Sequence, residues 1–183
     1  MTKVQLITSN LGKLKEFRAA LEPLGYDVAH LPLEVEEIQA DTLEEVVVDC
    51  MRQVRALKVK DFIIDDSGLF VDALKGFPGV YSSYALRTLG CEGLLKLLEG
   101  ADKRTARFEC CVGCSLEGRE DIVLSEACEG RIVQGMRGQG GFGFDPVFAA
   151  KGEERTFAEM PLDEKNAISH RGKAIKSLAR QLR

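Results

Sequence analysis

Phe62-Ile63-Ile64-Asp65-Asp66-Ser67-Gly68-Leu69-Phe70 is the stretch of sequence that decides the fold. Its first three residues form an apolar run typical of a buried strand. Two carboxylates then meet a serine and a glycine, and all four of these residues favour turns. We therefore expect a strand that ends at Asp65, then a turn, then a second extended segment from Gly68 to Ala73.

The same pair of acids points to chemistry. A strand that ends in two carboxylates holds oxygen ligands rigidly. Such a position suits Mg²⁺, which takes one or two carboxylates and leaves places for water and substrate phosphates. The alternative is that Asp65 to Gly68 form only a turn, and this stretch alone does not choose between the two.

The elements around this stretch follow the order of an α/β protein. Strands are expected at Val4 to Thr8, Tyr26 to Leu31, Arg107 to Leu116 and Ile122 to Val133. Helices are expected from the N-cap Asn10 to Pro23, over 43–58, over 86–98 with a break at Gly90, and after Ser169. This order predicts a mixed sheet with flanking helices, in one domain of residues 1–183.

Composition excludes several classes of function. The net charge of −4 and the pI of 5.4 argue against a broad nucleic-acid-binding surface, which is expected to be basic. The apolar runs are too short to span a membrane, and the first residues lack the apolar core of a signal peptide. A cytoplasmic protein is expected, with no nucleic-acid or membrane partner.

Six cysteines fit a reducing compartment better than a disulfide scaffold. The spacing Cys111-Val112-Gly113-Cys114 is suggestive of a metal site, but residues three apart in a strand point to opposite faces. We therefore predict that these thiols fill space in the core.

Thr8-Ser9-Asn10-Leu11-Gly12-Lys13 joins a strand to a helix N-terminus, which is a natural binding site for anions. Lys13 lies in the first helical turn, where a cation is mildly unfavourable unless a phosphate is bound nearby. The segment is not a P-loop, because Ile7 and Leu14 stand where that motif needs Gly and Ser or Thr. The alternative is a capped helix with a surface lysine.

Two later motifs combine glycine, aromatic and cationic residues. Gly138 to Gly143 formally matches a dinucleotide fingerprint, but Phe144-Asp145-Pro146 cannot easily continue the helix that the fingerprint needs. The loop either lays Phe142 on a flat ligand or is a surface turn with Phe144 in the core. The segment from Lys165 to Lys173 supplies donors and cations for a polar base or for phosphates, with His170 as acid or base, as donor, or as a structural residue.

Taken together, these segments resemble the inosine triphosphate pyrophosphatase family, which hydrolyses non-standard purine nucleoside triphosphates. The matching motifs are Thr8-Ser9-Asn10-x-x-Lys13, Asp65 to Leu69, Gly76 to Ser82, Gly141 to Pro146 and Ala158 to Arg171. The resemblance implies an elongated mixed β-sheet with helices in two lobes around a central cleft, in a homodimer. It also implies Mg²⁺-dependent release of pyrophosphate from ITP, dITP or XTP.

The resemblance further implies a role for each matching residue. Asp66 matches the essential acid, and Glu37, Asp65 and Asp66 match the metal ligands, with Glu36 as the alternative to Glu37. The matching substrate contacts are Thr8, Ser9, Asn10, Lys13, Ser67, Gly68, Phe142, Gly143, Phe144, Asp145, Lys165, Ser169, His170 and Arg171. Among these, Phe142 matches the aromatic residue that stacks on the base.

One position departs from the pattern. Many members of that family carry a lysine where this chain has Asp49. Either Arg52 replaces the missing cation or Asp49 joins the metal shell. The departure also motivates a second hypothesis, a nucleotide sensor without turnover, and a third is another phosphohydrolase or nucleotidyl transferase.

Overall fold

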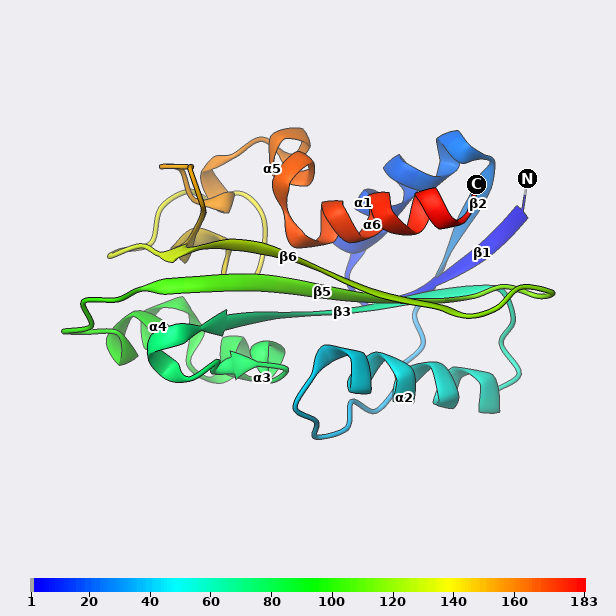
Figure 1. The fold of residues 1–183 in the computed structure, drawn as a ribbon, viewed down its shortest axis with the longest axis horizontal. Coiled ribbons are helices and arrows are strands. Elements are labelled where there is room, and N and C mark those ends of the chain that lie inside the picture. Colours follow the sequence, from blue (N-terminus) through cyan, green and yellow to red (C-terminus); the bar gives the residue numbers. More distant parts are fainter. Residues whose placement is uncertain (1) are drawn as a thin grey trace. The chain divides into compact units, whose positions relative to one another are not determined.

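The computed structural model describes residues 2–183 and is built on a seven-stranded mixed sheet with helices around it (Figure 1). The strands are β1 (Thr2–Ile7), β2 (Tyr26–Leu31), β3 (Phe62–Val71), β4 (Pro78–Gly79), β5 (Thr105–Ser115), β6 (Ile122–Ile132) and β7 (Phe148–Ala150). The helices are α1 (Leu11–Leu21), α2 (Leu43–Ala56), α3 (Ser82–Thr88), α4 (Gly90–Leu97), α5 (Leu162–Ile168) and α6 (His170–Gln181). The predicted α/β class with a mixed sheet is therefore confirmed.

The strand order is β2-β1-β3-β5-β6-β7, with β4 paired to β3. The chain forms two compact units. Unit 1 comprises Met1–Asp66, Cys110–Glu126 and Gly172–Arg183, and unit 2 comprises Ser67–Glu109 and Ala127–Arg171. The arrangement of two lobes around a cleft stays a prediction.

Unit 1 is a parallel arrangement in which β1 lies between β2 and β3. Helices α1 and α6 cover one face of its strands and α2 covers the opposite face (Figure 1). Phe17, Val28, Ile63 and Leu178 belong to the core on the α1 and α6 side. Ile7, the last residue of β1, pairs with Ile64, so Asp65 and Asp66 lie just beyond the carboxyl end of that strand.

Helix α2 confirms the prediction of a helix that begins at residue 43. Its N-cap Thr42 accepts a hydrogen bond from the backbone N–H of Glu45 at 3.2 Å, and the Glu45 carboxylate accepts one from the N–H of Thr42 at 3.0 Å. This reciprocal arrangement is a capping box. The helix ends at Ala56, two residues earlier than predicted, and Lys58 adopts a left-handed φ of 59°.

The predicted turn at Asp65 to Gly68 is wrong. Strand β3 runs without interruption from Phe62 to Val71. The local preference for a turn is overridden by the sheet. Beyond the two acids, Leu69 and Phe70 pair with β4, so the backbone stays extended there. Asp65 and Asp66 therefore lie in the middle of a strand, at the point where its pairing with β1 stops.

Unit 2 packs around an aromatic cluster. The Phe108 ring lies edge-on to Phe148, with centroids 4.7 Å apart, and Phe157 stacks 6.0 Å from Phe108. The predicted helix break at Gly90 is confirmed, with a φ of 66° there, but α3 begins at Ser82, four residues before the expected Leu86. The Ser82 hydroxyl accepts from the N–H of Leu69 and donates to the Gly79 carbonyl, which ties this helix start to β3 and β4.

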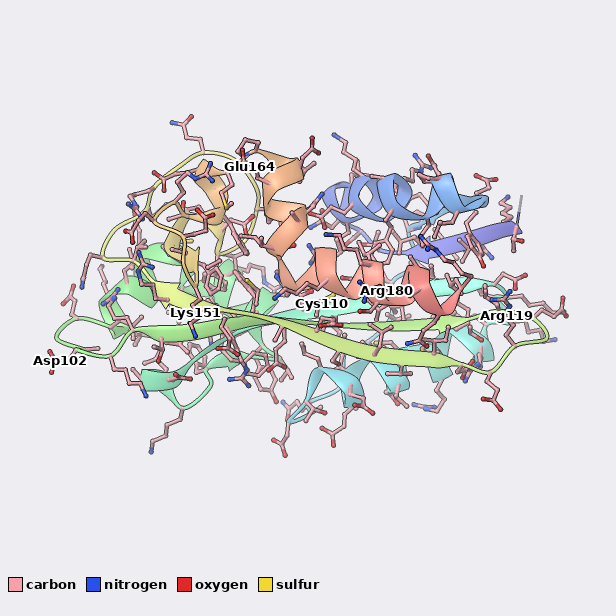
Figure 2. The ribbon with its side chains drawn as sticks, turned by 45° about the horizontal axis from the view of Figure 1, so that its top comes forward. Asp102, Cys110, Arg119, Lys151, Glu164 and Arg180 are labelled. Carbon is pink, nitrogen blue, oxygen red and sulfur yellow. The ribbon has the colours of Figure 1, made fainter. Side chains whose placement is uncertain are left out.

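The six cysteines are free and buried, as their predicted packing role requires. Figure 2 shows Cys110 on β5, and its thiol lies 3.8 Å from a carboxylate oxygen of Asp65. Figure 2 also shows Arg119 at the hairpin between β5 and β6, where it donates to the Leu182 carbonyl just after α6. No helix within residues 2–183 has the length and apolar character needed to cross a membrane.

Candidate active site

Unit 1 contains a pocket of about 530 Å³ at the ends of β1 and β2, bounded by α2. Its lining residues are Ile7, Thr8, Ser9, Lys13, Leu33, Glu34, Val35, Glu36, Glu37, Val46, Val47, Cys50, Ile64, Asp65 and Asp66. Six of the predicted site residues line it. Ligands of α/β sheets usually bind at this kind of position, beyond the carboxyl ends of the strands.

The N-terminus of α1 reaches this pocket through a well-formed cap. Asn10 Oδ1 accepts hydrogen bonds from the N–H groups of Gly12 at 2.8 Å and Lys13 at 3.4 Å, which confirms the predicted N-cap. Thr8 Oγ1 accepts from the Asn10 N–H at 3.0 Å. Because the cap uses Oδ1, a contact from the Asn10 side chain to a phosphate would come from its Nδ2 group.

Lys13 is not a free surface lysine. Its ammonium lies 3.1 Å from Asp65 Oδ2, and the side-chain exposures are 17% for Lys13 and 0% for Asp65. The same ammonium also donates to the backbone carbonyl of Asp65 at 3.3 Å. The buried Asp65 carboxylate is therefore balanced from within the protein, which suits it to hold Lys13 in place.

Asp66 and Glu37 also line the pocket, together with Cys50 of α2. Burial raises the pKa of the Cys50 thiol to about 12, and the charges of Glu37 and Asp66 contribute to that rise. Both carboxylates are therefore close enough to act on one buried sulfur. At neutral pH this thiol stays protonated, so the pocket offers carboxylate oxygens rather than a thiolate.

A hard cation fits this set of donors. Within residues 2–183, no three His, Cys, Asp or Glu side chains gather tightly enough to hold a metal ion by themselves. Mg²⁺ does not need such a cage, because it uses one or two carboxylates and completes its shell with water and substrate phosphates. Asp66 and Glu37 are two carboxylates that line the pocket, so the residues present fit this kind of site.

Unit 2 holds a second set of predicted residues, centred on Asp145. A single oxygen of its buried carboxylate accepts from Lys165 Nζ at 2.6 Å and from the Phe142 N–H at 2.8 Å. Asp145 and Lys165 are each 3% exposed. Gly141 is needed here, because its φ is 68° and a Cβ would lie 2.1 Å from the Asp145 carboxylate.

The Phe142 ring, which is 36% exposed, is the aromatic surface that this set presents. Lys165 Nζ lies 4.7 Å and Arg171 Cζ 5.2 Å from its centroid, both within the range of a cation–π interaction. Arg171 also donates to the Ser67 hydroxyl at 3.1 Å. His170 stacks on Phe108, with ring centroids 4.6 Å apart.

The other predicted residues of unit 2 take supporting positions. Phe144 is only 4% exposed and belongs to the core of the unit. Gly143 adopts a φ of 66° between Phe142 and this buried ring. Ser169 is buried between α5 and α6. Gly68 is required for packing, because a Cβ there would lie 2.4 Å from the Gly79 carbonyl oxygen.

A larger pocket in unit 2, of about 670 Å³, contains none of the predicted site residues. Arg104, which lines it, donates to the carbonyls of Leu98, Ile132 and Val133. Arg131, another lining residue, donates to Glu153 and Glu154. These cations hold the backbone of the surrounding loops.

Two residues at or near the first pocket were not predicted from the sequence. Cys50 lines the pocket, although the sequence shows it only as one position of an apolar stripe. Gln53 binds the backbone of Glu36 and the carboxylate of Asp49. Its only signal in the sequence is its position four residues after Asp49, on the same face of a helix. Asp49 itself pairs with Arg52 and is not among the residues that line the pocket.

Comparison with known proteins identifies the family of this chain. Residues 4–181 match the model of the Ham1 family. The dITP/XTP pyrophosphatase of Pyrococcus horikoshii is 48% identical over 96% of this chain and 94% of its own length. The dITP/XTP pyrophosphatase of Thermococcus kodakarensis is 46% identical over 99% of this chain and 97% of its own length.

Solved structures match as well. The Staphylococcus aureus Ham1 protein superposes with a TM-score of 0.86 at 33% identity, covering 99% of this chain and 98% of that one. A HAM1 protein from Coxiella burnetii gives a TM-score of 0.85 at 31% identity, covering 100% of this chain and 98% of that one. These findings confirm the family that the sequence motifs predicted.

Proposed function

Because this chain belongs to the Ham1 family, we propose that it hydrolyses non-standard purine nucleoside triphosphates such as dITP, XTP and ITP. The products are the nucleoside monophosphate and pyrophosphate. The substrates named for its relatives support this choice.

The observation that carries the proposal is the pocket of unit 1, which brings acids together with Lys13 and the N-terminus of α1. We assign the acids Asp66 and Glu37 to the metal, and Asp66 also to the orientation of the attacking water. The positive end of the α1 dipole, the Asn10 Nδ2 group and the Lys13 ammonium bind the triphosphate. Mg²⁺, when bound, would neutralise the charge that develops on the phosphate oxygens.

Asp65 was predicted as a metal ligand, and we now give it a different role. Its carboxylate is 0% exposed and lies 3.1 Å from the Lys13 ammonium. We propose that Asp65 holds Lys13 ready for phosphate, and that the metal is left to its neighbour Asp66.

The base would be recognised by the residues around Phe142. Its exposed ring offers a stacking surface, and Lys165 and Arg171 lie over it. Donors from His170 and Arg171 favour a purine with a 6-oxo group. A 6-amino group would leave these donors unpaired, at a cost of about 1–3 kcal/mol each, and ATP is disfavoured for that reason.

We also propose that the enzyme works in the cytoplasm as a homodimer. Support for the dimer comes from exposed apolar side chains on and near α3, where Phe77, Tyr81, Tyr84 and Leu89 are each more than a third exposed. The alternative, a nucleotide sensor without turnover, was motivated by Asp49, whose carboxylate is bound by Arg52 and Gln53.

The test is pyrophosphate release from dITP, XTP, ITP, GTP and ATP with Mg²⁺, for the wild type, Asp66→Asn and Asp102→Asn. We expect fast release from the first three nucleotides and slow release from GTP and ATP. Asp66→Asn should lower kcat by about 10²–10⁴-fold, the range for a positioned acid or base. Asp102→Asn changes an exposed acid in the loop before β5 and should match the wild type (Figure 2). Orthophosphate as the product would instead indicate another phosphohydrolase.

A further inference from the structure

The acidic loop, residues 32–40, joins β2 to α2 without forming a helix or strand of its own. It carries Glu37, and residues 33–37 line the pocket. A segment outside the regular elements has no ladder of hydrogen bonds to fix its backbone, so other groups must satisfy and hold it. What holds this loop determines where the Glu37 carboxylate lies.

Gln53 of α2 provides such a support through both ends of its amide. Its Oε1 accepts from the N–H of Glu36 at 3.0 Å, and its Nε2 donates to the carbonyl of the same residue at 2.7 Å. These two bonds satisfy both the backbone N–H and the backbone carbonyl of Glu36, as a neighbouring antiparallel strand does for a residue in a hydrogen-bonded pair. The backbone directly before Glu37 is thereby fixed to a helix.

Asp49 determines which way round the Gln53 amide sits. Gln53 Nε2 also donates to Asp49 Oδ2 at 2.8 Å, and a carboxylate can only accept. A flipped amide would place its oxygen against both the Asp49 carboxylate and the Glu36 carbonyl. Arg52 donates to Asp49 Oδ1 at 2.6 and 3.1 Å, and the hydrogen bonds from Arg52 and then Gln53 lower the pKa of Asp49.

We propose that Asp49 and Gln53 form a clamp that positions the Glu37 carboxylate for the metal ion. This inference rests on the proposed function, which assigns Glu37 to Mg²⁺. It gives Asp49 a role where the family resemblance leads one to expect a phosphate-binding lysine. In this chain, residue 49 therefore supports a metal ligand, whereas a lysine at this position would bind phosphate.

The clamp is tested with Gln53→Met, which keeps the length of the side chain and removes its hydrogen bonds. Asp49→Ala is the second variant, and it leaves Gln53 in place without the carboxylate that orients it. Val48→Ala, at a half-exposed position on the same helix, is the matched control. Thermal unfolding first establishes that all three variants are folded.

Two readouts follow. The first is amide hydrogen exchange at Glu36 in protein free of metal and nucleotide, which we expect to be at least about 10-fold faster in Gln53→Met, because the amide loses its acceptor. The second is the Mg²⁺ concentration that gives half-maximal release of pyrophosphate from dITP. It should rise by about 10- to 100-fold, as expected when the support of a metal ligand is lost, while kcat at saturating Mg²⁺ changes little.

The outcomes separate the two proposals. Unchanged exchange at Glu36 in both variants overturns the clamp, and so does faster exchange with an unchanged Mg²⁺ requirement. A wild-type protein that releases no pyrophosphate overturns the proposed function, and the exchange experiment then still reports whether Gln53 fixes the loop.

Discussion

At the scale of single residues, two buried carboxylates each form a short ion pair with a lysine. Asp65 holds Lys13 in unit 1, and Asp145 holds Lys165 in unit 2. In both pairs the carboxylate is at most 4% exposed. A buried carboxylate without a partner is costly, so each acid keeps its lysine in one position. The sequence predicted all four residues for the site but not their pairing, because partners 52 and 20 residues apart meet only in the folded chain.

Phe142 allows a direct test of base recognition. Replacing it with alanine removes the exposed ring that lies under Lys165 and Arg171. Stacking of a base on an aromatic side chain is worth about 1–3 kcal/mol, so KM for dITP should rise by about 10- to 100-fold in Phe142→Ala. Steady-state kinetics measure this, with Phe142→Trp as the control that keeps a stacking surface. Equal KM values in the alanine variant and the wild type would show that the base binds elsewhere.

At the scale of elements, the long helices and strands could be predicted from hydrophobic periodicity, and the cap at Asn10 from its residue type. The continuity of β3 could not. Asp65, Asp66, Ser67 and Gly68 favour a turn locally, but β3 lies between β1 and β5 in the sheet and its later residues pair with β4, and this pairing keeps the stretch extended. Local preference is a weak guide where a sheet supplies neighbours on both sides.

The contact between β5 and α2 can be tested at Gly113. A Cβ there would lie 2.4 Å from Met51 Sδ and 2.8 Å from Val47 Cγ1, so an added methyl group overfills the contact. We expect Gly113→Ala to lower the free energy of unfolding by about 1–3 kcal/mol. Urea denaturation measures the change. Gly135→Ala is the control, because nothing lies within 4 Å of a Cβ at that position. Equal stability of the two variants would mean that the helix moves away without cost.

At the scale of the whole molecule, buried thiols make stability sensitive to alkaline pH. Burial is the main cause that raises the pKa of Cys114 to about 12 and that of Cys111 to about 11. In the unfolded chain these thiols ionise near pH 9. Above pH 9 the unfolded state therefore binds fewer protons than the folded state, and the free energy of unfolding falls as the pH rises.

Each such thiol contributes a slope of at most about 1.4 kcal/mol per pH unit between the two pKa values. We expect Cys114→Ala to be less stable than the wild type at pH 8, because it leaves a cavity, but to lose less stability between pH 9 and pH 10.5. Denaturation curves at pH 8, 9 and 10.5 give the change of the free energy of unfolding with pH for both proteins. Parallel loss in the two proteins would show that other groups cause the alkaline instability.

Neither of the two compact units is continuous in the sequence. Unit 1 draws on three separate segments and unit 2 on two, and β3, β5 and β6 each supply residues to both. A chain made from its N-terminus, at about 5–20 residues per second, therefore completes unit 2 only at Arg171 and unit 1 only when α6 has followed. The pocket acids are made early, but the helix that covers their strands is made last. Neither unit therefore has all of its segments until synthesis has reached α6.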